Sequence, residues 1–162
     1  MQGGILSYGL LVALAIALLV AAVTDIRRRE IDNWLNAAIA LGAPLFWLAS
    51  GLSGFEVLIQ IAIAFVAFLV LLALFATGTM GGGDVKLLTA IALWIHPLWF
   101  LQLLIVMSVA GGLLTLALYI RHRLRKSQAR LAVPYGVAIS LAGLWTLASQ
   151  YVWNAPVAAF LG

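Results

Sequence analysis

Residues 87–120 read LLTAIALWIHPLWFLQLLIVMSVAGGLLTLALYI, a stretch without Asp, Glu, Lys or Arg. It is too long for one comfortable membrane-spanning helix, because about 20 apolar residues cross the hydrocarbon core of a bilayer. His96-Pro97 interrupts the stretch with a dipeptide that favours a turn. We therefore predict two helices here, a short one over about 84–95 and a full-length one over about 98–120.

The rest of the chain repeats this pattern of long apolar stretches between short charged segments. Hydrophobic residues make up 65% of the 162 residues and charged residues 9%, whereas a typical soluble domain has about 25% charged residues. The other charge-free stretches are residues 1–24, 33–55, 57–83 and 131–162. We therefore predict an all-α membrane protein with a single domain over residues 1–162. Its remaining spans are expected at about 5–24, 34–51, 55–77 and 134–153.

The basic residues indicate how these helices are oriented. They lie at 27–29, at 86 and between 121 and 130. Six membrane-spanning helices, with a short fourth one, place all three groups on one side of the membrane, whereas five would move the last group across. Because positively charged loops stay cytoplasmic, we predict six spans with the termini outside and the charged loops cytoplasmic. This clustering favours contact with membrane lipid and not with nucleic acid, despite the net charge of +4.

Two aspartates stand out because the predicted topology brings them to the same membrane boundary. Asp25 ends the first span within TDIRRREIDN, residues 24–33, and Asp84 begins the short fourth helix within TMGGGDVK, residues 79–86. Two carboxylates within reach of one water are suited to peptide hydrolysis, because one removes a proton from water while the other, protonated, polarises the carbonyl. Taken singly, Asp25 also fits an interfacial acid beside arginines, and Asp84 fits a helix N-cap.

The glycines before Asp84 and the positions of the helix ends indicate further roles. Gly81, Gly82 and Gly83 lack a Cβ and so let another backbone approach closely. That property suits a loop that holds an extended substrate, although an ordinary turn between helices also explains it. A helix N-terminus favours an anion and a C-terminus disfavours one. We therefore hypothesise that Asp84 is the ionised base and Asp25 the protonated partner.

Three segments of the chain together resemble the type IV prepilin peptidases. Asp25 is followed by a basic stretch and then by IDN at residues 31–33, which resembles the first motif of that family. GGGDVKL at residues 81–87 resembles its GxGD motif, and VPYGVAI at residues 133–139 resembles the segment that begins its last helix. The three segments occur in the order of the family and extend over most of the chain.

This resemblance implies a six-helix membrane fold and an aspartic endopeptidase without a metal or other cofactor. Asp25 and Asp84 would be the catalytic aspartates, and Gly81 and Gly83 the glycines of the motif. The substrate would be a prepilin precursor with a basic leader and a hydrophobic helix, cut at the cytoplasmic face of a prokaryotic inner membrane. The residues that we expect to bind the substrate or shape the site are Gly81, Gly82, Gly83, Lys86, Asn33, Pro134, Tyr135 and Gly136.

Two departures from the family pattern refine this expectation. Asp32 stands where the first motif usually has proline, which makes the turn less rigid but removes no catalytic atom. The chain has no cysteine, whereas the larger family members carry a domain with paired cysteines and also methylate the new N-terminus. The chain therefore resembles the minimal tight-adherence (Flp pilus) branch, which implies cleavage without N-methylation.

Three other classes of protein share some of these features. Acids inside membranes often mark ion paths in transporters and channels, but here no acid lies in the middle of a predicted span. Proteases of the presenilin and signal-peptide-peptidase kind share the GxGD pattern, but they are larger and have Tyr before the partner aspartate, where this chain has Thr24. A non-catalytic membrane assembly factor of a pilus or secretion system stays open as an alternative.

Overall fold

The computed structural model describes residues 4–124 and 134–153, and within these ranges the chain is helical and contains no strand. The helices are α1 (Ile5–Arg28), α2 (Asn33–Ala49), α3 (Gly54–Ala76), α4 (Gly82–Ala92), α5 (Pro97–Leu124) and α6 (Tyr135–Leu147), and a π-helix (Ala148–Trp153) follows α6. The predicted all-α fold with six helices is confirmed. The predicted division of residues 87–120 is confirmed as well, since α4 ends at Ala92 and α5 begins at Pro97.

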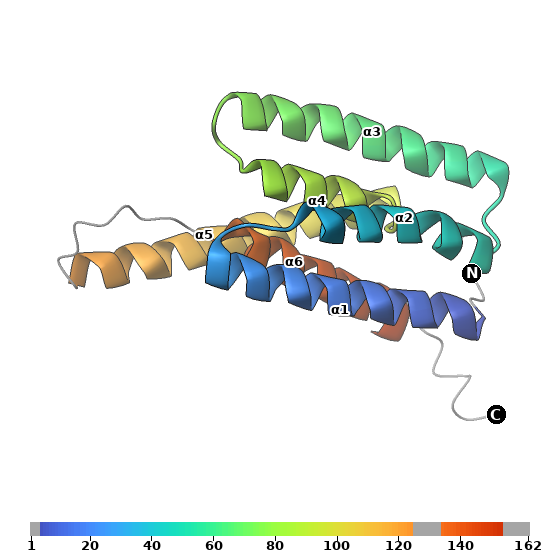
Figure 1. The fold of residues 1–162 in the computed structure, drawn as a ribbon, viewed down its shortest axis with the longest axis horizontal. Coiled ribbons are helices and arrows are strands. Elements are labelled where there is room, and N and C mark those ends of the chain that lie inside the picture. Colours follow the sequence, from blue (N-terminus) through green and yellow to red (C-terminus); the bar gives the residue numbers. More distant parts are fainter. Residues whose placement is uncertain (1–3, 125–133, 154–162) are drawn as a thin grey trace.

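The lengths and directions of the helices are those of a membrane-embedded bundle. Three helices, α1, α3 and α5, are long and apolar enough to cross a membrane, and α2 is apolar but shorter. Successive helices run in opposite directions in Figure 1. The α1–α2 and α3–α4 connections therefore lie at one end of the bundle, together with the end of α5 and the start of α6.

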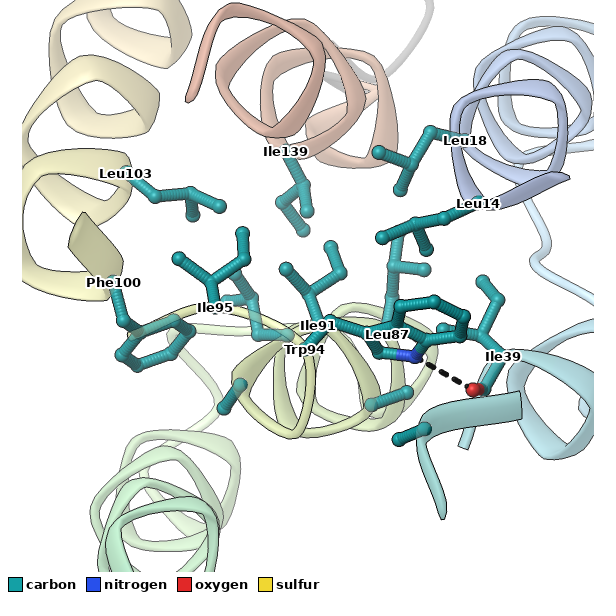
Figure 2. Packing of buried hydrophobic residues seen from close by; sticks show 14 of the residues in the cluster. Leu14, Leu18, Ile39, Leu87, Ile91, Trp94, Ile95, Phe100, Leu103 and Ile139 are labelled. Carbon is teal, nitrogen blue, oxygen red and sulfur yellow. Dashed lines mark hydrogen bonds between the residues drawn. The ribbon is translucent and has the colours of Figure 1, made fainter. Parts of the chain in front are cut away.

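The short helix α4 lies at the centre of this bundle. It contacts α2, α3 and α6, and Figure 1 shows it between α2 and α3. The side chains of Leu87, Leu88 and Ile91 are 0% exposed, which fits a helix that is apolar around most of its circumference. Figure 2 shows the residues of the other helices that surround it, among them Leu14, Leu18, Ile39, Phe100, Leu103 and Ile139.

The carbonyl end of α4 is buried, and side chains of two neighbouring helices bind it. Gln60 of α3 donates from Nε2 to the carbonyls of Ala92 and Ile95, at 2.6 Å each. Trp47 of α2 donates from Nε1 to the carbonyl of Leu93 at 2.8 Å. The last carbonyls of a helix have no partner within it, and an unpaired polar group is costly in an apolar interior. These bonds allow a helix of 11 residues to end inside the bundle.

Candidate active site

Asp25 lies in the last turn of α1, and its carboxylate contacts the start of α6. The residue is 6% exposed, and its Oδ2 accepts a hydrogen bond from the backbone N–H of Val137 at 3.2 Å. A Cβ on Gly136 would lie 2.8 Å from the same oxygen, which is closer than such atoms approach. Glycine at position 136 therefore lets the first turn of α6 pack directly against the carboxylate.

This contact corrects the electrostatic setting that we predicted for Asp25. The residue does end α1, where a helix terminus disfavours an anion, but its carboxylate lies at the N-terminal end of α6. Free N–H groups and the helix dipole favour an anion there. Asp84 also lies in the first turn of its helix. Helix ends alone therefore do not distinguish the two carboxylates, and the assignment of Asp84 as the ionised base and Asp25 as the protonated partner stays a prediction.

Asp84 is the third residue of α4, and its side chain turns back toward the glycine that precedes the helix. Gly81 is the N-cap of α4, and a Cβ there would lie 3.0 Å from Oδ2 of Asp84. A Cβ on Gly83 would instead make an ordinary contact of 3.6 Å with Ile31. Of Gly81 and Gly83, it is therefore Gly81 whose missing side chain leaves room for the Asp84 carboxylate.

Asp25 and Asp84 line one cavity at this end of the bundle. The cavity has a volume of about 440 Å³, within the range of sites that hold small ligands or a short stretch of chain. Two carboxylates in one site repel each other when both are charged, which favours a pair that shares one proton. The lining residues are Asp25, Arg29, Glu30, Ile31, Asn33, Gly81, Gly82, Gly83, Asp84, Lys86 and Tyr135.

Most of the predicted site residues meet around this cavity. Asn33, Lys86, Tyr135 and the three glycines line it beside the two aspartates. The Nζ of Lys86 donates to Oδ1 of Asn33 at 2.8 Å, which joins the first turns of α4 and α2. Pro134 is the N-cap of α6, and Gly136 packs against the Asp25 carboxylate from outside the lining.

Three residues of the α1–α2 connection also line the cavity, and sequence reasoning missed them as site residues. They are Arg29, Glu30 and Ile31. Arg29 has a left-handed φ of 56°, and its N–H donates to the Asp25 carbonyl at 2.9 Å. Its positive charge also acts on the Asp25 carboxylate. The sequence favoured a role of this arginine in membrane topology over contact with the leader or with lipid, because nothing in it marks an arginine that adopts the conformation usually left to glycine.

The position where the family usually has proline carries an ion pair in this chain. Oδ2 of Asp32 lies 2.8 Å from a guanidinium nitrogen of Arg28, and the two side chains are 30% and 58% exposed. An exposed pair of this kind contributes at most about 1 kcal/mol. The pair links the last turn of α1 to the start of α2. It spans the turn that we predicted to be less rigid because Asp32 replaces the proline.

Two further predictions concern a metal site and a basic loop. Within the described residues, no group of three or more His, Cys, Asp or Glu side chains is placed to hold a metal ion, and the metal-free site stays a prediction. Three residues of the predicted basic loop, Arg125, Lys126 and Arg130, lie outside the described residues.

The fold and the cavity together define a helical membrane protein in which two aspartates line a common cavity at one end of the bundle. Residues 12–116 match the type IV leader peptidase family, and the chain belongs to this family. The family that we inferred from three sequence segments is thereby confirmed. The matched range includes Asp25 and Asp84 and ends before Tyr135. No curated protein and no solved structure matches the chain.

Proposed function

We propose that this chain is an aspartic endopeptidase that removes the leader of type IV or Flp prepilins, with Asp25 and Asp84 as its catalytic pair. Membership of the leader peptidase family supports the kind of reaction and the prepilin substrate. The observation that supports the aspartic mechanism is the cavity that Asp25 and Asp84 both line. The single domain over residues 1–162 carries this activity at the cytoplasmic face of a prokaryotic inner membrane.

Hydrolysis by this pair begins with one carboxylate ionised and the other protonated. The ionised carboxylate removes a proton from water as the water oxygen attacks the carbonyl carbon of the scissile bond, and the protonated one gives its proton to the carbonyl oxygen. When the C–N bond breaks, the leaving nitrogen takes the proton that came from water. The other carboxylate recovers its proton from the diol, so the pair returns to its starting state.

The loop before α4 is suited to hold the scissile peptide beside this pair. Gly81, Gly82 and Gly83 line the cavity, and the first N–H groups of a helix have no partner within it. An extended peptide offers carbonyls to such groups. Binding of this kind holds the reacting atoms at close range, which contributes strongly to catalysis.

We also infer that the helices make six crossings and that the aspartate cavity lies at the cytoplasmic boundary. The alternating helix directions bring Arg27, Arg28, Arg29 and Lys86 to the same end of the bundle, and positively charged loops stay cytoplasmic. With 11 residues, α4 is roughly 17 Å long, which is shorter than a hydrocarbon core of about 30 Å. The fourth crossing is therefore completed by the turn that leads to α5.

Labelling of single cysteines in intact cells tests this topology, because the chain has no cysteine of its own. Gly54→Cys places a thiol at the start of α3, where a Cβ meets nothing within 4 Å. Thr79→Cys places one in the α3–α4 connection. We expect a membrane-impermeant maleimide to label Gly54→Cys in intact cells and Thr79→Cys only after permeabilisation. The reverse pattern would contradict the proposed orientation.

Coexpression with a prepilin precursor tests the activity itself. We expect the precursor to lose its leader only in cells that make this chain, and the mass of the new N-terminal peptide to show no methyl group. The absence of cysteine supports the second expectation. A methylated N-terminus would overturn the Flp-type assignment but keep the peptidase. A precursor that keeps its leader, in cells where pilus assembly still depends on the chain, would favour a non-catalytic assembly factor.

A further inference from the structure

A second cavity opens beside the aspartate cavity, and residues of α2, α3 and α4 line it. Its volume is about 400 Å³. We call it the α2–α4 groove, and its lining residues are Asn33, Asn36, Ala37, Ala40, Phe68, Lys86, Thr89, Ala90 and Leu93. Asn33 and Lys86, which are hydrogen-bonded to each other, line both cavities. The groove therefore adjoins the aspartate cavity at Asn33 and Lys86 and continues along α2 and α4 to Ala40 and Leu93.

The groove contains a buried polar side chain with no partner. Asn36 is 5% exposed, and among the described residues neither its Nδ2 nor its Oδ1 has a hydrogen-bond partner. An amide left unpaired in an apolar interior costs about 1–3 kcal/mol. Because the amide both donates and accepts, it fits a polar group that a ligand brings into the groove.

We propose that the α2–α4 groove seats the hydrophobic helix of the prepilin precursor, and that Asn36 hydrogen-bonds a polar group near the start of that helix. This inference rests on the proposed function. The groove lining includes three residues with small side chains, Ala37, Ala40 and Ala90. Small residues of this kind let helices approach closely in membranes. A helix in the groove brings the peptide bond that precedes it to Asn33 and Lys86, at the mouth of the aspartate cavity.

A third cavity offers a competing path to the catalytic pair. It has a volume of about 300 Å³, and its lining residues are Thr79, Met80, Asp84, Met107, Ser108, Gly112, Tyr135 and Ile139. Its polar side chains include Ser108, whose hydroxyl already donates to the Leu104 carbonyl at 2.7 Å. The α2–α4 groove is favoured because the amide of Asn36 is left without a partner inside it.

Disulfide cross-linking separates the two paths. Ala37 and Ala38 are both exposed on α2. Ala37 lines the groove, whereas Ala38 does not. In an Asp84→Asn background that retains the precursor, we expect Ala37→Cys to cross-link to a cysteine in the hydrophobic helix of the precursor, and Ala38→Cys not to. Cross-linking from Met107→Cys in place of Ala37→Cys would overturn the proposal. Cleavage by the unmodified chain, assayed in parallel, reports failure of the proposed function separately.

Kinetics of leader removal provide a second test. Filling the groove with Ala37→Trp is expected to raise KM at least about tenfold, the equivalent of about 1.4 kcal/mol of binding, while Ala38→Trp leaves KM within about twofold. Asn36→Leu is expected to raise KM without lowering the melting temperature, because the change removes an unpaired buried amide. A lowered melting temperature with unchanged KM would show that Asn36 serves the fold and would overturn its role in binding.

Discussion

Asp25→Asn and Asp84→Asn are each expected to reduce the rate of leader cleavage by roughly 10³-fold, since general acid–base catalysis contributes about 10²–10⁴. Asparagine keeps the shape of the side chain but neither removes a proton from water nor gives one to the carbonyl. The double variant is expected to be no slower than either single variant, because two residues that act as a unit are not additive. Initial rates of leader removal by purified protein in lipid measure all three.

Asp32→Asn is the matched control for this experiment. Asp32 belongs to the same connection as the cavity-lining residues, but its carboxylate pairs with Arg28 and lies outside the cavity lining. Because an exposed pair contributes at most about 1 kcal/mol, its loss is expected to change the rate by no more than about fivefold. Full processing by both catalytic variants would refute the aspartic mechanism. Processing by only one of them would show that the pair is wrongly assigned.

The limits of the helices were predictable because they depend on charged and turn-forming residues at the helix ends. Long charge-free stretches predicted α1, α2 and α3, and His96-Pro97 predicted the break between α4 and α5. The position of Asp25 and Asp84 at the same end of the bundle followed from counting the helices. These features depend on residues close together in the sequence, which is the information that hydrophobicity and turn residues carry.

The contacts between helices were not predictable, because lipid and protein core attract the same side chains. Leu18 is 0% exposed, whereas Leu19 beside it is 53% exposed, and the composition of α1 does not separate them. The bond between Val137 and the Asp25 carboxylate joins residues 112 positions apart. The capping of α4 by Gln60 likewise depends on how α3 packs. The second helix end beside Asp25, which α6 supplies, could not be predicted for the same reason.

Gly136→Ala is expected to lower kcat by about 10²-fold, the cost of a small misplacement of a catalytic group. The added Cβ would lie 2.8 Å from Oδ2 of Asp25 and 2.9 Å from Cδ1 of Ile31, so the carboxylate has to move. The bond from Val137 holds that carboxylate in place, and its displacement breaks the geometry of the pair. KM is expected to change little, because the substituted position lies behind the carboxylate and not in the cavity lining.

Two comparisons identify which contact causes the loss of activity. Gly9→Ala adds a methyl group where a Cβ meets nothing within 4 Å, so the rate stays unchanged and α1 gains up to about 1 kcal/mol of helix stability. Adding Ile31→Val to Gly136→Ala removes Cδ1 but leaves the contact with Asp25, so activity is expected to stay low. Recovery in that double variant would assign the loss to Ile31, and full activity in Gly136→Ala alone would show that α6 does not position the carboxylate.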